Sequence, residues 1–151
     1  MNFKLNNLTE LVASTPNDFD HSVGYHDIRP FNKFDDKLMV LHRYPLNNLG
    51  FLEDDVDVDI CLWNYHNSKI DKIDTTGAWS WEQGSRLQWL NENEIIYNKI
   101  DDGRLVSYIY NIQEKKKKIL KNPVYSVSKK TKRILTLNYS RLWNLWKPYG
   151  Y

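Results

Sequence analysis

The chain has 151 residues, of which 41% are hydrophobic and 14% aromatic, and it holds only six glycines and five prolines. This length fits one domain, and the composition excludes a disordered chain. The formal net charge of +2 hides two opposed parts: residues 1–103 carry nine Lys and Arg against eighteen Asp and Glu, whereas residues 104–151 carry twelve against one. Such asymmetry indicates either a surface for a polyanion or mutual attraction between the two parts.

Residues 1–20 form a lead segment before the first predicted sheet. Leucines and a valine between residues 5 and 12 have helical spacing, but the stretch is short and ends before Pro16, so a helical turn is one option and irregular chain the other. The segment has polar residues where a secretory signal needs a continuous apolar run, and no later run has the length of a membrane span. We therefore expect a soluble, cytoplasmic protein with no membrane partner.

Short β-strands follow the lead segment. The clearest hairpin joins residues 95–100 to residues 105–112 across a turn in which Gly103 supplies a positive φ angle. Residues 119–120 return as a short outer strand, and Pro123 then blocks further pairing. Apolar residues between the turns recur with the period of a strand more than with that of a helix, which predicts an all-β chain.

One pattern occurs three times: a short apolar strand, a polar turn and a stronger strand. The three copies start at Ile28, Leu87 and Val124. The stronger strands start at Leu38, Ile95 and Ile134, so the copies are 57 and 39 residues apart. These intervals straddle the period of roughly 40 to 50 residues of a propeller blade with four antiparallel strands. The pattern predicts a partial β-propeller of about three consecutive four-stranded antiparallel blades over residues 21–151.

The stretches DVDICLWNY, AWSWEQGSRLQWL and PVYSVSKKTKRILTLNYSRLWNLWKPYGY, with the hairpin between them, resemble the first blades of a family of bacterial β-propellers. This family is related to the TolB-like and oligogalacturonide-lyase-like propellers, and the resemblance covers roughly residues 21–151. Propellers close with roughly four to eight blades, so about three blades imply a truncated or split propeller. Because an open arc leaves strand edges uncovered, we expect another chain, or a second copy, to complete it.

Residues 78–90, AWSWEQGSRLQWL, place three tryptophans around a polar centre. In one interpretation the tryptophans pack between blades, while Gln83 and Arg86 hydrogen-bond backbone in a tight loop. In the other, the loop reaches the propeller mouth, where indole faces stack on sugar rings and the polar side chains bind hydroxyls. The candidate ligand-binding residues are Trp79, Trp81, Glu82, Gln83, Arg86 and Trp89.

Histidines are the obvious material for a metal site or an acid–base catalyst. His26 and the adjacent Asp27, in HSVGYHD, are the candidates for such a role. The resemblance implies a histidine-based metal site in the related lyases, but its motifs belong largely to later blades that this chain does not contain. His42 alternates with Leu41 and Arg43 along a strand and is interpreted as a packed histidine.

Two other stretches have structural interpretations. Cys61 is the single cysteine, which excludes an internal disulfide and a multi-cysteine metal cluster, and the apolar run ICLWNY predicts that its thiol is buried. Residues 54–60, DDVDVDI, do not start a calcium loop, because Ile60 stands at the position of its glycine and His66 at that of its glutamate. They are interpreted as a strand with Val56, Val58 and Ile60 inward and Asp57 and Asp59 outward.

Lysine runs at residues 115–118 and 129–133 are expected in solvated hairpin turns. Tyrosines interleave with this charge, and aromatic stacking beside phosphate contacts is how single strands are held, so a polyanion surface is the alternative. Nucleic acid is the less favoured partner, because no RNA-binding or helix-turn-helix motif accompanies the charge.

The favoured function is non-catalytic binding or scaffolding, with a glycan-type ligand. One alternative is part of a carbohydrate-active lyase or hydrolase, with His26 and Asp27 contributing to a site that missing blades complete. The other is polyanion or nucleic-acid binding through the basic C-terminal third. The sequence lacks a glycine-rich phosphate loop, a nucleophile elbow and a zincin histidine pair. Enzymatic activity is therefore left open, and no cofactor is expected.

Overall fold

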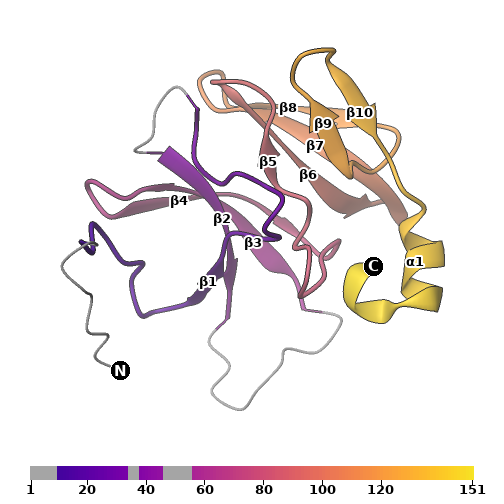
Figure 1. The fold of residues 1–151 in the computed structure, drawn as a ribbon, viewed down its shortest axis with the longest axis horizontal. Helices are drawn as coiled ribbons and strands as arrows, with labels where there is room; N and C mark the ends of the chain where they lie inside the picture. Colours follow the sequence, from indigo (N-terminus) through magenta and orange to yellow (C-terminus); the bar gives the residue numbers. More distant parts are fainter. Residues whose placement is uncertain (1–9, 34–37, 46–55) are drawn as a thin grey trace.

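The computed structural model describes residues 10–33, 38–45 and 56–151, and these ranges form two four-stranded antiparallel sheets, a two-stranded sheet and a short helical segment (Figure 1). The first sheet has its strands in chain order: β1 (Asp20–Ser22), β2 (Leu38–Tyr44), β3 (Val58–Asn64) and β4 (Lys69–Thr76). A bulge between Ile60 and Cys61 shifts the register of the β3–β4 pair. Val58 and Ile60 are fully buried, as the interpretation of residues 54–60 predicts, but the strand begins at Val58, and Val56 lies before it and is half-buried.

The second sheet repeats this order with β5 (Gln88–Trp89), β6 (Glu94–Asp101), β7 (Arg104–Asn111) and β8 (Lys116–Leu120). The predicted hairpin is confirmed: β6 and β7 pair along their whole length, and Asp102 and Gly103 both have positive φ, as a tight two-residue turn requires. The short outer strand is also confirmed, but it begins earlier than expected. Lys116 to Lys118 lie in β8 and not in a turn, because β7 offers them a free edge.

The third sheet has two strands in the described part of the chain, β9 (Ser126–Ser128) and β10 (Arg133–Leu135). Val127 pairs with Ile134, as expected, but a third four-stranded sheet is not present there. The chain turns instead into α1 (Tyr139–Leu145) and η1 (Lys147–Tyr149), two helices that the sequence interpretation missed. The side chain of Asn138 caps α1 by accepting a 2.9 Å hydrogen bond from the amide of Arg141.

Three of the sequence predictions fall partly or wholly on residues that are not described, and the strand at residues 54–60 is one of them. The helical option at residues 5–12 is the second; the described residues 10–16 contain no helix. The third is the polar turn in the first copy of the repeated pattern, at Asp35 and Asp36, although Phe31 and Met39 on its two sides form a bridge. None of the helices in the described ranges has the length and apolarity needed to cross a bilayer.

The first and second sheets share one hydrophobic core. Its buried members are Val40, Ile60, Leu62, Leu87, Trp89, Ile95, Tyr97 and Tyr110. The opposite face of the first sheet buries a second cluster around Cys61 and Trp63, against which Ala13 of the lead segment packs. The buried thiol is confirmed, and desolvation raises the pKa of Cys61 to about 12, so it is protonated and unreactive at neutral pH.

Asp74 on β4 joins the outer strands of both sheets. Its carboxylate binds the ammonium groups of Lys99 on β6 and Lys117 on β8, both at 2.7 to 2.9 Å, and it accepts a 2.6 Å hydrogen bond from the hydroxyl of Tyr97. Burial acts to raise the pKa of Asp74, but these bonds lower it to about 2. The ion pair between Asp74 and Lys117 thus joins the acidic part of the chain to the basic part within the fold.

Candidate ligand-binding site

The loop that connects the two sheets folds back on itself between Ser80 and Gly84. Their backbone groups form a bridge, with the amide of Gly84 donating to the carbonyl of Ser80 at 2.8 Å. Gly84 and Arg86 both have positive φ, and a Cβ on Gly84 would lie 2.5 Å from Cε1 of His42. The turn therefore needs glycine there, and it directs residues 79–82 and residues 83–89 to different environments.

The outer half of the loop, residues 79–82, carries an aromatic cluster. Trp79 is buried and donates a 2.6 Å hydrogen bond from its indole to the carbonyl of Val56. Trp81 is 46% exposed, and its ring stacks on Tyr44 at 5.6 Å with an interplanar angle of 13°. Trp79 meets the edge of Trp81 at 5.1 Å. The exposed ring of Trp81 is thus held in place by two aromatic neighbours and leaves much of its surface to solvent.

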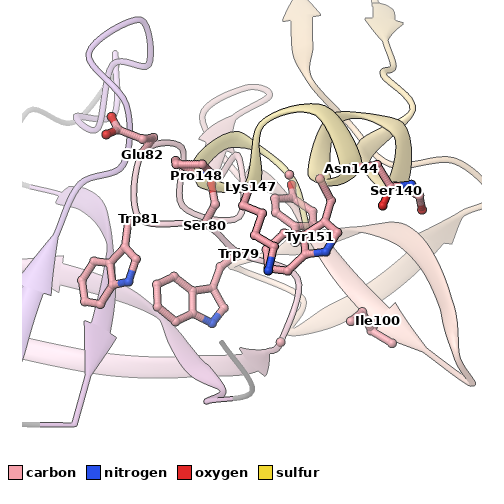
Figure 2. A pocket seen from close by; sticks show the side chains of 13 residues that line it. Trp79, Ser80, Trp81, Glu82, Ile100, Ser140, Asn144, Lys147, Pro148 and Tyr151 are labelled. Carbon is pink, nitrogen blue, oxygen red and sulfur yellow. The ribbon is translucent and has the colours of Figure 1, made fainter. Parts of the chain in front are cut away.

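A cavity of about 610 Å³ lies between this cluster and the segment that contains α1 and η1 (Figure 2). The lining residues from the sheets and the loop are Gly77, Trp79, Ser80, Trp81, Glu82 and Ile100, and those from the helical segment are Ser140, Trp143, Asn144, Lys147, Pro148, Gly150 and Tyr151. Pockets for small molecules are commonly about 300 to 1,000 Å³, mostly apolar, with a few polar groups. This cavity has that size and that composition.

Polar groups around the cavity are of several kinds. Glu82 is exposed beside Trp81, and Lys147 holds its ammonium 5.0 Å from the centre of the Trp143 ring. Asn144 and two serines add amide and hydroxyl groups that both donate and accept hydrogen bonds. An aromatic wall with such groups is able to hold a flat, hydroxyl-rich molecule by stacking and hydrogen bonding.

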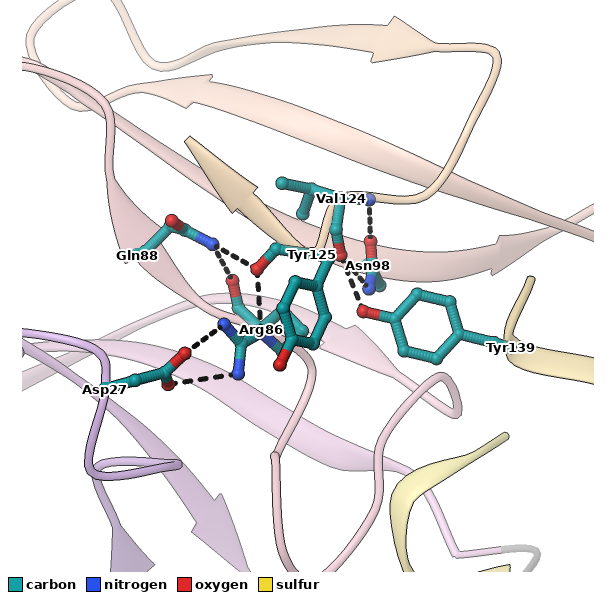
Figure 3. A network of polar contacts seen from close by, with 7 residues as sticks. All are labelled: Asp27, Arg86, Gln88, Asn98, Val124, Tyr125 and Tyr139. Atoms are coloured by element: carbon teal, nitrogen blue, oxygen red, sulfur yellow. Dashed lines mark hydrogen bonds and ion pairs between the residues drawn. The ribbon is translucent and has the colours of Figure 1, made fainter. Parts of the chain in front are cut away.

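Arg86, in the inner half of the loop, is a structural residue (Figure 3). Its side chain is 1% exposed and binds both carboxylate oxygens of Asp27, at 2.8 and 3.1 Å. It also donates a 2.8 Å hydrogen bond to the carbonyl of Tyr125, whose ring lies 4.2 Å from the guanidinium carbon. Arg86 thereby ties the segment before β2, the loop before β5 and the segment before β9 together.

The other inner residues of the candidate set are also buried. Trp89 belongs to the shared core and donates from its indole to the carbonyl of Pro30 at 2.8 Å. Gln83 is buried beneath the turn, away from the lining of the cavity. The structure therefore brings Trp79, Trp81 and Glu82 to one cavity and does not bring the other three candidates to it.

His42 is fully buried against the same turn, as its interpretation as a packed histidine predicts. Its Nε2 accepts a 3.0 Å hydrogen bond from the amide of Ser85 and lies 2.8 Å from the Ser85 hydroxyl. Desolvation lowers the pKa of His42 to about 4, so it is neutral under ordinary conditions. It supports the loop and is enclosed too completely to meet a ligand.

His26 and Asp27 are not arranged as a metal site. His26 is exposed with its ring 4.0 Å from that of Tyr25, and the carboxylate of Asp27 is engaged by Arg86. Across the described ranges, no group of three or more His, Cys, Asp or Glu side chains is placed to hold a metal ion.

The two lysine-rich segments have different neighbours: acidic side chains in β8, and other positive charges at the β9–β10 hairpin. In β8, Lys117 binds Asp74 and Lys116 binds Glu114. Lys129 at the tip of the β9–β10 hairpin lies near Arg29 and Lys33, and desolvation together with these positive charges lowers its pKa.

The cavity residues of the helical segment were missed by the sequence interpretation. Trp143, Asn144 and Lys147 were included in the last repeat of the strand pattern. Asn138 as a helix cap and Pro148 as a residue of the next short helix are the signals that indicate helix there.

Comparisons of this chain with family models, with curated proteins and with solved structures find no match. The relation to TolB-like propellers therefore stays a prediction from the sequence motifs.

Proposed function

We propose that the protein is a non-catalytic binding module whose cavity between Trp81 and the α1–η1 segment takes a saccharide. The observation that carries this proposal is the exposed, immobilised ring of Trp81 at the wall of a 610 Å³ cavity. A ring that two aromatic neighbours already hold loses little conformational freedom when a ligand stacks on it. The apolar face of a sugar ring fits such a surface, and Glu82, Asn144 and Lys147 supply partners for its hydroxyls.

Binding without catalysis agrees with the groups that line the cavity. Most glycoside hydrolases use two carboxylates on opposite sides of the scissile bond. Among the described residues, the cavity lining contains one acidic side chain, Glu82, and no histidine. These groups suit recognition of a saccharide better than its cleavage.

We also propose that the sheets are successive blades of a partial β-propeller. The support is that the first two sheets have the same four-stranded order and share a core. The β9–β10 sheet would be the start of the next blade. Ile134 and Leu135 are exposed on it although they are adjacent in the strand, so both faces of this sheet are open. A two-stranded sheet is marginal alone, and further strands from a second copy would complete it.

Isothermal titration calorimetry with three uncharged saccharides, cellotriose, chitotriose and maltotriose, tests the ligand proposal. We expect at least one of them to bind the wild-type protein and Trp81→Ala to weaken this binding by at least tenfold. The matched control is Trp146→Ala, because Trp146 is 63% exposed in the same region but does not line the cavity. Lack of binding by all three, or equal losses in the two variants, would overturn the proposal.

The mass of the purified chain in solution, measured by light scattering, tests the partner proposal. A mass of two or more chains supports completion by a second copy. A monomer that unfolds in one sharp transition would mean that the open sheet is stable without a partner, and would reject this part of the proposal.

A further inference from the structure

Asn98 on β6 connects three parts of the molecule. It is fully buried, and its side-chain amide donates a 2.8 Å hydrogen bond to the carbonyl of Val124 and accepts a 2.7 Å bond from the Val124 amide. The same amide donates to the hydroxyl of Tyr151. One side chain therefore holds both the segment that enters β9 and the far end of the helical segment.

Tyr139 and Tyr151 are the residues by which the helical segment is docked. Their rings stack at 4.4 Å with an interplanar angle of 16°, and the hydroxyl of Tyr139 donates to the carbonyl of Val124 at 2.8 Å. Gly150 packs so closely on Trp143 that a Cβ there would overlap the Trp143 backbone. The chain thus folds back over α1 and returns Tyr151 to Asn98.

The rest of the helical segment contributes little to this docking. Tyr139 is the buried residue of α1, and η1 has none. Leu145 is 78% exposed and Trp146 63% exposed. Segments with few buried apolar contacts open locally at low free energy, without unfolding of the whole domain.

We propose that Asn98 and Tyr151 form a latch that positions residues 139–151 as a wall of the cavity, and that ligand affinity depends on this latch. Seven of the thirteen described lining residues come from the segment, so the cavity exists in its present form while the segment is docked. The dependence on a ligand rests on the saccharide-binding function proposed above.

Thermodynamic linkage connects docking of the helical segment to the affinity for a ligand. A ligand that touches both Trp81 and the helical wall binds the docked form better than the open form, so it stabilises docking. The apparent dissociation constant is the intrinsic constant divided by the docked fraction, so a change that favours the open form weakens ligand binding by the factor by which it lowers that fraction. Asn98 is in this sense a positioning residue, because it acts on the cavity through Tyr151 and does not line it.

Substitution of Tyr151 tests the latch without disturbing the core residue Asn98. Tyr151→Phe keeps the ring and removes the hydroxyl that Asn98 binds. Since a hydrogen bond contributes about 1 kcal/mol, or about fivefold in an equilibrium constant, we expect about fivefold faster amide hydrogen exchange in residues 139–150. Tyr151→Ala also removes the stacked ring, and we expect an acceleration on the order of a hundredfold. The control Leu145→Ala changes an exposed residue of the same segment outside the cavity.

Exchange at β2 and β6 distinguishes a latch from a general loss of stability. The latch predicts unchanged exchange there, and a saccharide affinity in Tyr151→Phe and Tyr151→Ala that falls by the factor by which the docked fraction, measured by exchange, falls. Unchanged exchange in residues 139–150 in both variants would overturn the latch, and so would unaltered affinity in a variant whose segment is mostly open by exchange. If the wild-type protein binds no saccharide, the proposed function fails, and the latch is then decided by hydrogen exchange alone.

Discussion

The two halves of the loop at residues 79–89 have similar compositions and opposite surroundings. The outer half places Trp81 and Glu82 at the cavity, where solvent reaches them. The inner half places Arg86 and Trp89 among buried groups that fix the sheets to each other. Each half thus contains an indole and a charged side chain, which are exposed at the cavity in the outer half and buried in the inner half. The difference comes from the turn at Gly84, because residues on its two sides leave in different directions.

The largest effect is expected for Arg86→Ala. The change removes the ion pair with Asp27, which is 39% exposed and so remains solvated, and the shorter of two hydrogen bonds to the carbonyl of Tyr125, which keeps a 3.4 Å bond from Gln88. Because the Arg86 side chain is 1% exposed, its removal leaves a cavity that costs about 3 kcal/mol, and the lost hydrogen bond adds about 1 kcal/mol. We expect the free energy of unfolding, measured with urea, to fall by about 4 kcal/mol. Arg104→Ala, an exposed control, should change it by less than about 0.5 kcal/mol. A loss below 1 kcal/mol for Arg86→Ala would mean that the inner half is not structural.

Acidification gives the next effect, through His42 under the turn. The unfolded chain has a histidine pKa of 6.5, whereas burial lowers the pKa of folded His42 to about 4, so the unfolded state binds the proton more tightly in this range. The contribution of His42 to stability is complete above pH 7.5, decreases as the pH falls from 6.5 to 4, and is constant below that. The loss amounts to about 3 kcal/mol.

Urea unfolding of His42→Gln across the same pH range measures this contribution. The variant should lack most of the decrease between pH 6.5 and 4, while His66→Gln, at an exposed histidine, should keep it. Burial also lowers the pKa of His21 and adds a decrease of the same sign, so the slope in His42→Gln will not reach zero. Equal slopes in His42→Gln and the wild type would contradict the described burial of His42.

Two glycine substitutions compare the turn at the centre of the loop with an ordinary hairpin turn. Gly84 and Gly103 both have positive φ, so alanine costs about 1 kcal/mol of backbone strain at either position. At Gly84 the new Cβ also meets the His42 ring at 2.5 Å, whereas at Gly103 nothing lies within 4 Å. Overpacking adds about 2 kcal/mol. Gly84→Ala should therefore destabilise by about 2 kcal/mol more than Gly103→Ala in thermal or urea unfolding, and equal losses would show that the turn is not packed on His42.

The smallest effect on stability is expected at the outer half. Trp81→Ala removes a half-exposed ring and its stacking on Tyr44, a loss of about 1 kcal/mol. Trp89→Ala, the matched change in the inner half, should cost about 3 kcal/mol because it leaves a cavity in the shared core. Similar losses in the two variants, measured by urea unfolding, would remove the distinction between the halves.

Strand patterns were the part of the fold that the sequence predicted well. Alternating apolar residues and the turn at Gly103 placed the β6–β7 hairpin correctly, since this pairing is local and has a period of two. The strand β8 was found only at its last two residues, because its lysines were assigned to a turn. The helix α1 was missed because its residues bury little, so that no apolar stripe of helical period marks it.

Only part of the candidate site could be predicted from the sequence, and the reason is physical. Trp79, Trp81 and Glu82 line the cavity, but the burial of Arg86 depends on Asp27, which is 59 positions away. Pairing over that distance leaves no periodic signal in one sequence. The opposite wall was missed for the same reason, because Asn98 and Tyr151 are 53 positions apart.

The indole resonances of the six tryptophans provide the most direct test of the central claim, that the outer half of the loop faces a ligand and the inner half does not. Trp79, Trp81 and Trp143 line the cavity, whereas Trp63, Trp89 and Trp146 do not. A ¹H–¹⁵N NMR titration with cellotriose, chitotriose and maltotriose reads all six at once. We expect at least one saccharide to shift the resonances of Trp81 and Trp143 and to leave those of Trp63 and Trp89 unchanged. No shift with any of the three, or shifts that centre on Trp89, would contradict it.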